Sequence, residues 1–370
     1  MFPQPPLWLV LIAFICALGP LVFFHELGHY LVARLFKIPA ETFSIGFGRE
    51  LIGWTDRQGT RWKVAWLPLG GYVKFVGDMS PASNPGDLDG IPEELRDRIF
   101  QLRPVWQRFL VVFAGPIANF LLAIVIFAGI YCLVSSPTTN RIGSVEPRSA
   151  AATAGFAPGD RILSIADKDT PSFNEVRSLV ESRPNQVVAI RFERAGKVQR
   201  IPVKLGMDSA KDSTGKQIKI GLLGVSAAPV SVVKGVPLAV VQTVRITGWI
   251  FDGAVKLIAG EGSRRDVGGA IRIAQVAGQA ASLGALPFLG LLALLSINLG
   301  FINLLPVPML DGGHLFFYAV EAVRRRPLSA RALDWAFRGG LAVILALVVF
   351  TTINDLGSLG LWDRLQRLIG

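Results

Sequence analysis

Cysteine and histidine are scarce in this sequence. Among 370 residues there are two cysteines and three histidines. Cys16 and Cys132 both lie inside apolar runs, where a free cysteine behaves as a small hydrophobic side chain. Their number and placement exclude a disulfide-rich domain and a metal site built on paired cysteines. A transition-metal site in this chain would therefore have to use histidine and carboxylate ligands.

Charged side chains are absent from four long segments. Residues 7–24, 109–137, 273–310 and 339–354 contain no Asp, Glu, Lys or Arg. A helix needs roughly 17–25 apolar residues to cross a bilayer, so these runs predict about four transmembrane helices, of which the last is the shortest. Residues 1–6 lack the basic side chain of a signal peptide, and we expect the first helix to be retained.

The basic residues indicate how these helices are oriented. Arginine and lysine are frequent in residues 34–108 and 324–338, which lie on the same side of a four-span protein. Basic loops stay in the cytoplasm, so residues 138–270 are predicted to lie on the opposite, periplasmic side. The net charge of +11 then reflects topology and contact with anionic lipid. No basic stripe with interleaved aromatic residues suggests nucleic-acid binding.

Residues 138–210 have the composition of a small soluble α+β domain. Three apolar–polar alternations, at 160–165, 187–192 and 198–203, predict strands, and residues 173–182 have helical spacing. The segments Ile-Gly-Ser-Val at 142–145, Gly-Phe at 155–156 and Pro-Gly-Asp-Arg-Ile-Leu-Ser-Ile at 158–165 resemble bacterial PDZ domains. Such domains bind an extended peptide by strand addition. The alternative is a generic structural β-domain.

A linker is expected to follow this domain, at residues 211–270. Within it, residues 235–258 carry Arg245, Asp252 and Lys256 among apolar side chains. This mixture favours an amphipathic helix at the outer membrane interface over a fifth span. Residues 1–137 would then hold the first two transmembrane helices and residues 271–370 the last two.

The first apolar run ends in the motif His25-Glu26-Leu27-Gly28-His29. Residues four apart share one face of a helix, so both imidazoles can bind one Zn²⁺ while Glu26 reaches a water on the metal and acts as general base. An incidental match is the competing interpretation. Three ionisable groups in five residues at the end of a membrane helix are costly without a partner, which favours the metal site.

A catalytic zinc usually has three protein ligands. Asp311 is the best third candidate because the first and third spans run in the same direction, which places His29 and Asp311 at one membrane depth. His314 is the competing third ligand, and its alternative is a supporting or interfacial role. Pro306 and Pro308 interrupt the chain just before Asp311 and can turn its carboxylate inward.

Taken together, these motifs resemble the site-2 protease family, and within it the bacterial regulator of sigma-E protease group. The segments that agree, besides the two motifs above, are Gly-Phe-Gly at 46–48, Leu-Pro-Leu-Gly-Gly-Tyr-Val-Lys at 67–74, Phe-Ala-Gly-Pro-Ile-Ala-Asn-Phe at 113–120 and Asn-Leu-Leu-Pro at 303–306.

The resemblance implies that His25, His29 and Asp311 bind one zinc ion and that Glu26 is the catalytic base. It also implies an enzyme of the bacterial inner membrane whose active site lies near the cytoplasmic side. Its substrates would be single-span proteins, such as anti-sigma factors, after another protease has trimmed them. Some members carry two PDZ domains, whereas one is visible here.

Substrate must reach the metal as an unwound chain, because a membrane helix hides its carbonyl groups in hydrogen bonds. Residues 43–77 predict a membrane-associated β-hairpin with a turn at 56–59 and a strand at 62–66. We hypothesise that the edge at residues 62–66 pairs with substrate.

Further candidates for substrate binding are Gly70, Gly71 and Tyr72 in this hairpin, and Asn298, Asn303 and Asn119 in the spans. The asparagines can instead make interhelical hydrogen bonds.

The sequence thus predicts a polytopic α-helical membrane protein with a hairpin, one external PDZ-like domain and zinc endopeptidase activity. A peptide-binding adaptor without catalysis is a competing class, against which Glu26 and the ligand set argue. A metal transporter is another, and it would need polar residues spread along the spans.

Overall fold

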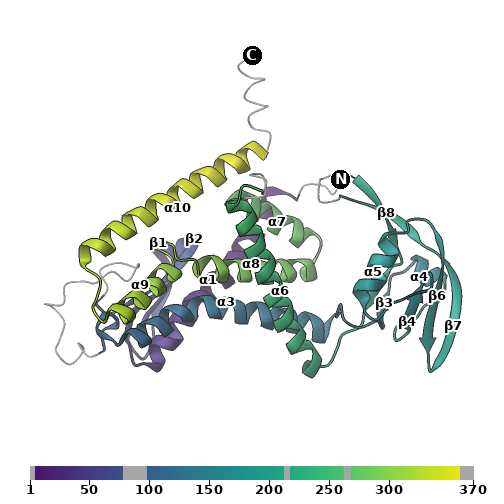
Figure 1. The fold of residues 1–370 in the computed structure, drawn as a ribbon, viewed down its shortest axis with the longest axis horizontal. Coiled ribbons are helices and arrows are strands. Elements are labelled where there is room, and N and C mark those ends of the chain that lie inside the picture. Colours follow the sequence, from purple (N-terminus) through teal and green to yellow (C-terminus); the bar gives the residue numbers. More distant parts are fainter. Residues whose placement is uncertain (1–4, 78–97, 212–216, 262–267, 359–370) are drawn as a thin grey trace, which may run out of the picture. The chain divides into compact units, whose positions relative to one another are not determined.

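The structure is a computed structural model that describes residues 5–77, 98–211, 217–261 and 268–358 (Figure 1). The chain divides into two compact units. The helical unit comprises residues 1–124 and 243–370, and the sheet unit comprises residues 125–242.

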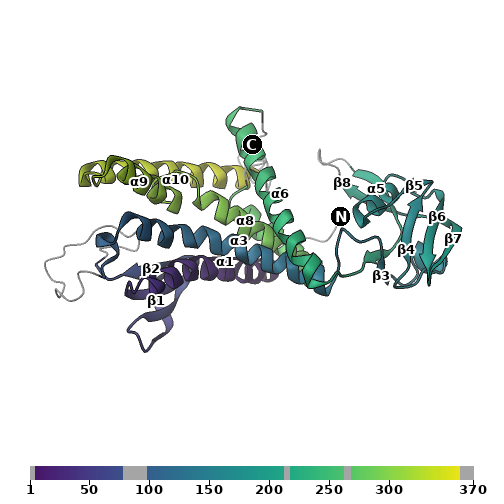
Figure 2. The ribbon, with the colours of Figure 1, turned by 60° about the horizontal axis from the view of Figure 1, so that its bottom comes forward.

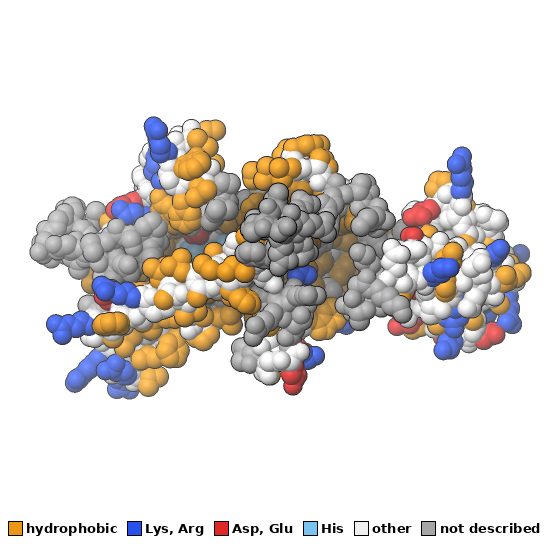
Figure 3. Space-filling model, turned by 90° about the horizontal axis from the view of Figure 1, so that it is seen from above, with side chains coloured by type: hydrophobic (Ala, Val, Ile, Leu, Met, Phe, Trp, Pro, Cys, Tyr) orange, Lys and Arg blue, Asp and Glu red, His pale blue; other side chains and the backbone are white. Residues whose placement is uncertain are grey.

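Four of the described helices are long and apolar enough to cross a membrane. They are α1 (Leu7–Leu35), α3 (Val105–Leu133), α8 (Ala285–Asn303) and α10 (Ala330–Ser358). Large apolar side chains stay exposed along α10, and Figure 3 shows hydrophobic side chains over much of the helical surface in that view. Surface of this kind requires an apolar solvent, which a bilayer provides. The described residues thus hold four candidate spans, the number that the uncharged runs predict, and their topology in the membrane stays a prediction.

The third uncharged run differs from its prediction as one span. It contains most of α7 (Ala270–Ser282) and the whole of α8, and it ends in an irregular segment before α9 (Asp311–Arg324). Gly284 separates α7 from α8 with a φ of 115°, a conformation that glycine adopts without strain. The candidate span α8 is therefore shorter than the run, and Asp311 begins a separate helix.

Small residues let α1, α3 and α8 approach one another closely (Figure 2). A β-carbon on Gly28 of α1 would lie 2.4 Å from the carbonyl oxygen of Ala114 in α3. A β-carbon on Gly300 of α8 would lie 3.0 Å from the carbonyl oxygen of Pro116. The Ser296 hydroxyl also donates a 2.7 Å hydrogen bond to the carbonyl oxygen of Asn119. Packing of small residues is the usual basis of helix association in lipid.

The strands β1 (Ala40–Thr55) and β2 (Arg61–Phe75) form an antiparallel pair. Because both strands bend, each strand contributes two segments, or rows, to the sheet. The rows lie side by side in the order 71–75, 40–45, 61–64 and 50–55. Residues 71–75 are one outer row, and no described strand pairs with their far side.

This register contradicts the hypothesis of a free edge at residues 62–66 for the first three of those residues. Trp62, Lys63 and Val64 each have paired residues on both sides. Their backbone hydrogen bonds are already used within the sheet, because the two halves of β1 pair with the two sides of this segment.

The sheet unit is built from short strands and two helices. A four-stranded sheet has the order β5 (Lys168–Asp169), β4 (Arg161–Ile165), β6 (Val187–Arg194) and β7 (Lys197–Lys204). Two separate pairs join β3 (Ile142–Val145) to β10 (Val225–Ala227) and β8 (Gly206–Lys211) to β9 (Gln217–Leu222). The helices α4 (Ala150–Thr153) and α5 (Phe173–Glu181) complete the unit. Its core contains Ile162, Ile190, Phe192 and Val176.

The predicted domain end at residue 210 is too early. Residues 217–227, expected in a linker, form β9 and β10, and β10 pairs with β3 at the start of the domain. The following residues form one continuous helix, α6 (Val232–Ile258). Its place at the outer interface stays a prediction.

Candidate metal centre

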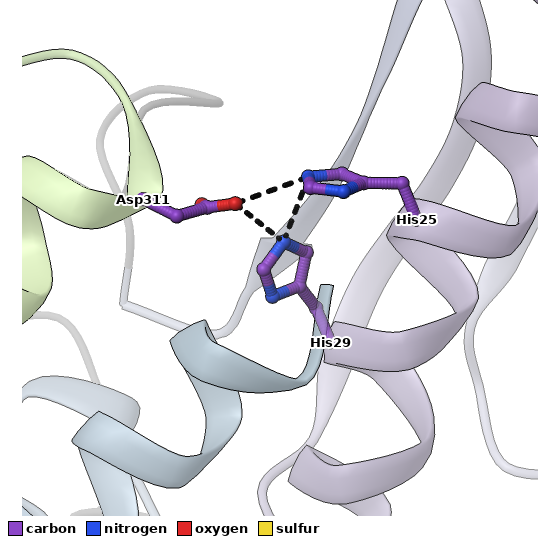
Figure 4. Close-up of side chains that lie close together, drawn as sticks. All are labelled: His25, His29 and Asp311. Carbon is purple, nitrogen blue, oxygen red and sulfur yellow. Dashed lines mark hydrogen bonds and ion pairs between the residues drawn. The ribbon is translucent and has the colours of Figure 1, made fainter. Parts of the chain in front are cut away.

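Three side chains from two helices converge in the helical unit (Figure 4). His25 and His29 lie one turn apart on α1, and their Nε2 atoms are 3.3 Å apart. Asp311 is the first residue of α9, and its Oδ2 lies 3.1 Å from His25 Nε2 and 3.6 Å from His29 Nε2. Within the described residues, this is the one cluster of at least three His, Cys, Asp or Glu side chains with the spacing of metal ligands.

The distances within this triangle fit a zinc ion. Bonds of about 2.0–2.2 Å in a tetrahedral site place neighbouring ligand atoms roughly 3.3–3.6 Å apart. The three observed distances, 3.1, 3.3 and 3.6 Å, surround that value. Asp311 Oδ2 is also buried and accepts no hydrogen bond. A buried carboxylate oxygen facing two imidazole nitrogens without a proton donor is costly unless a cation lies between them.

The backbone fixes the orientation of His29. Its Nδ1 lies 2.9 Å from the carbonyl oxygen of Val111 in α3. A carbonyl can only accept, so Nδ1 carries the proton and the Nε2 lone pair faces the cluster. Gly115 leaves room for the ring, since a β-carbon there would lie 2.2 Å from His29 Nε2.

His25 has polar neighbours on both ring nitrogens. The side-chain amide of Asn119, which is fully buried in α3, lies 3.0 Å from His25 Nδ1. The amide nitrogen of Asn303, the last residue of α8, lies 3.4 Å from His25 Nε2. Asn303 is thus on the ligand side of the ring and Asn119 on the opposite side.

Two glycines position Asp311 by allowing the preceding segment to fold back over the start of α9. A β-carbon on Gly312 would lie 2.2 Å from the carbonyl oxygen of Leu305, and one on Gly313 would lie 2.4 Å from that of Val307. Larger residues at either position would push the segment away from the helix and move the carboxylate with it.

Glu26 lies against the outer row of the hairpin. Its carboxylate lies beside the backbone of Val73 in β2, and both residues line the same cavity. A β-carbon on Gly71 would lie 3.0 Å from Glu26 Cγ and 2.6 Å from Val22 Cγ1. The strand β2 therefore holds the side chain of the expected base from the side opposite α1.

A cavity of about 220 Å³ contains the cluster and Glu26. Of the residues expected to bind substrate, it is lined by Gly71, Tyr72 and Asn303. Gly70, Asn298 and Asn119 are not among its lining residues. Gly70 has a φ of 135° and packs beside Phe47.

His314 also lines this cavity but is not part of the cluster. Its ring packs 5.3 Å from that of Phe337 and 6.3 Å from that of Tyr318. Between the two candidates for a third ligand, the structure brings Asp311 and not His314 to the two histidines.

Sequence reasoning missed Val111, Gly115 and Val73, which act on the site through the backbone or through the lack of a side chain. Gly115 carried one signal, because it lies in the Phe-Ala-Gly-Pro segment at residues 113–116, which resembles the family. The two valines carried none, since any residue supplies a carbonyl or an N–H group.

Comparison with known proteins identifies the family. The model of peptidase family M50 matches residues 13–347. The chain belongs to peptidase family M50. The resemblance to the site-2 protease family and the expectation of a peptidase are thereby confirmed, whereas closeness to the sigma-E regulator group stays a prediction.

Relatives match the chain over nearly its full length. A candidate zinc metalloprotease of Agrobacterium fabrum is 43% identical, over 94% of this chain and 96% of its own. One from Rhizobium meliloti is 45% identical over the same shares. The metalloprotease MmpA of Caulobacter vibrioides is 38% identical, over 94% of this chain and 95% of its own.

A PDZ domain structure from an SdrC-like protein of Listeria monocytogenes aligns with 25% of this chain and 88% of its own, at 22% identity and a TM-score of 0.19. A likeness of that score carries no argument, so the PDZ-like assignment rests on the sequence motifs alone.

Proposed function

We propose that this M50 peptidase is a zinc endopeptidase that cleaves single-span membrane proteins within the bilayer. The observation that carries the proposal is the buried triangle of His25, His29 and Asp311 with Glu26 in the same cavity. The names of its relatives, which are zinc metalloproteases, support the choice of metal. The apolar helices around the cavity support a substrate that arrives through lipid.

Each protein group has a distinct part in the hydrolysis. Zinc, when held by the two imidazoles and the Asp311 carboxylate, supplies a Lewis acid that polarises the scissile carbonyl and acidifies water. Glu26 takes a proton from the attacking water and passes it to the leaving amide nitrogen, so that water adds across the C–N bond and gives a carboxylate and an amine. Packing of Gly71 and Val73 in β2 against Glu26 would hold its carboxylate at the cavity.

The outer row of the hairpin, residues 71–75, is where an unwound substrate would pair. Gly71, Tyr72 and Val73 line the cavity, and their far side has no paired strand among the described residues. Main-chain pairing there would satisfy the groups that unwinding frees. Asn303, at 3.4 Å from His25 Nε2, is placed to donate to the substrate carbonyl or to the oxyanion that develops from it.

The positions of the basic segments support an active site near the cytoplasmic side of a bacterial inner membrane, with the sheet unit in the periplasm. The hairpin exposes Leu51, Ile52, Trp54 and Trp66, which supports its contact with the membrane. Trimming of the substrate by another protease and an anti-sigma factor as substrate remain expectations from the family resemblance.

The decisive experiment uses the purified protein in lipid vesicles with a single-span substrate. Glu26→Gln should lower kcat about 10²–10⁴-fold while zinc stays bound, and a chelator should abolish cleavage. Glu146→Gln, an exposed glutamate of the sheet unit away from both cavities, is the matched control and should cleave as wild type does. Cleavage that survives Glu26→Gln or the chelator would refute the mechanism. Substrate binding without cleavage in the wild type would identify an adaptor, and zinc flux across the vesicle would identify a transporter.

The sheet unit is proposed to act on substrate choice. A cleft of about 470 Å³ between α5 and β9, lined in part by Arg177, Ser178 and Ile220, offers space for an extended peptide. Ser178→Trp would fill it. If the cleft binds a peptide of the substrate, this variant should cleave a trimmed substrate more slowly than wild type does. If the sheet unit instead excludes bulky substrates, the variant should cleave at the wild-type rate. Deletion of the unit should then allow cleavage of the untrimmed substrate.

A further inference from the structure

A histidine that binds a metal through Nε2 must carry its proton on Nδ1, and that proton needs an acceptor. For His29 the acceptor is the Val111 carbonyl, at 2.9 Å. His25 has no backbone carbonyl within hydrogen-bond distance of Nδ1 among its described contacts. Its Nδ1 faces the side-chain amide of Asn119, at 3.0 Å.

Asn119 does not lie where a residue that binds substrate would lie. Its side chain is fully buried and is not part of the cavity lining. It lies behind the His25 ring, at the closely packed crossing of α1, α3 and α8. Its backbone carbonyl also accepts a 2.7 Å hydrogen bond from the Ser296 hydroxyl at this crossing. A buried amide in such a place is fixed in position but can present either of its two ends.

The structure has the amide nitrogen of Asn119 next to His25 Nδ1, and the amide oxygen is buried without a hydrogen-bond partner. With the amide nitrogen in that place, a proton on His25 Nδ1 has no acceptor. Rotation of the amide by half a turn exchanges oxygen and nitrogen with little change of shape. The oxygen then accepts from Nδ1–H, and the Nε2 lone pair becomes free for a metal.

We propose that Asn119 is a positioning residue for the metal site, because its amide oxygen accepts the Nδ1 proton of His25 and so presents the Nε2 lone pair to zinc. This inference rests on the proposed zinc site and assigns Asn119 to the metal ligand instead of to the substrate. The two histidines are then held in the same tautomer by neighbours from one helix, α3, one through a backbone carbonyl and the other through a side chain.

The test compares variants that separate the acceptor role from packing. Asn119→Leu keeps the approximate shape and removes the acceptor, and zinc affinity should fall about 10–100-fold. Asn119→Asp restores an acceptor that, when ionised, cannot donate, and affinity should recover to within a few-fold of wild type. Ser296→Ala removes a buried hydrogen bond at the same crossing without touching His25, and it should bind zinc as wild type does.

Zinc affinity is measured by competition with a chromogenic chelator on the full-length protein in detergent, with thermal unfolding as the check on folding. Wild-type zinc affinity in Asn119→Leu would overturn the proposal, as would an Asp variant that is folded but as weak as the Leu variant. If the wild type itself binds no stoichiometric zinc, the metal site fails and not only the role of Asn119.

A second measurement needs no variant. The chain has three histidines, so ¹⁵N-histidine labelling of the zinc-loaded wild type gives few NMR signals. Two rings with protonated Nδ1 and unprotonated Nε2 are expected, and the His25 Nδ1–H should be protected from exchange with water. A zinc-loaded protein in which His25 Nδ1 carries no proton would overturn the proposal even if Asn119→Leu fails to fold.

Discussion

Gly115 is the position at which a single methyl group should disable the metal site. In Gly115→Ala the new β-carbon would lie 2.2 Å from His29 Nε2 and 2.4 Å from Cε1, far inside van der Waals contact. The His29 ring would have to move by about an ångström or more, because ordinary carbon contacts begin near 3.5 Å. Separation of the helices offers no cheap relief, since α1 and α3 are already in close contact at Gly28.

The expected magnitude follows from what the ring loses by moving. It gives up the hydrogen bond to Val111, worth about 1 kcal/mol, and its alignment toward Asp311. Disturbing the support of a metal ligand typically weakens metal binding about 10–100-fold, which is roughly 1.4–2.7 kcal/mol. The metal-free protein should not be destabilised to the same degree, because alanine favours a helix by up to about 1 kcal/mol over glycine.

The assay is thermal unfolding with and without saturating zinc, together with chelator competition and cleavage of a model substrate. Gly129→Ala is the matched control, since it lies on the same helix and its β-carbon meets nothing within 4 Å. Gly115→Ala should lose zinc-dependent stabilisation and cleavage while Gly129→Ala keeps both. Zinc binding and cleavage at control levels in Gly115→Ala would refute the assignment of His29 as a ligand in this geometry.

Three further outcomes are expected. Gly71→Ala should lower kcat while zinc stays bound, because its β-carbon displaces Glu26 and not a ligand; loss of zinc instead would contradict the separate roles of β2 and α1. Removal of zinc by a chelator should lower the unfolding temperature of the wild type, and an unchanged temperature would argue against a metal bound at the triangle. In the sheet unit, burial opposes ionisation of Asp160, but hydrogen bonds and charge from Arg194 outweigh it and lower the pKa of the carboxyl. A lowered pKa gives stability that is present above the unfolded value of about 3.9 and lost as pH falls through the folded value. Asp160→Asn should therefore cost about 1.5–3 kcal/mol of unfolding free energy at neutral pH and make the unit less sensitive to acid, whereas the exposed Asp167→Asn should change little; equal effects would contradict the reasoning.

Local periodicity was sufficient to predict the parts of the site that lie on one helix. His25 and His29 face the same side because they are four residues apart, and Glu26 follows from the same motif. The depth of Asp311 required one further step, the counting of spans from uncharged runs. Even though the third run divides into several elements, the carboxylate reaches the histidines, because the direction of α8 and not the length of the run sets that depth.

The hairpin shows where local patterns fail. Alternation of side chains indicates that a segment is a strand, but it does not say which of its two edges is occupied. The rows at 61–64 and 71–75 belong to one strand, and the choice of outer row depends on a bend that is not visible in the alternation. The end of the sheet unit was missed for a related reason, since β10 pairs with a strand some 80 residues earlier.

Asn119 shows how chemistry can narrow what periodicity leaves open. A polar residue in a span can face a cavity or a neighbouring helix, and sequence spacing gives no preference between them. Each histidine ligand, however, requires an acceptor on its far nitrogen, and in both rings that nitrogen faces the neighbouring helix and not α1. An acceptor must then come from another element at the same depth. In this chain α3 supplies two, the carbonyl of Val111 and the side chain of Asn119. These two residues are about two turns apart on α3, and the histidines that they contact are one turn apart on α1. The residues that support a metal site are therefore recognised by their position opposite the second nitrogen of each ligand, and not by their place in the cavity lining.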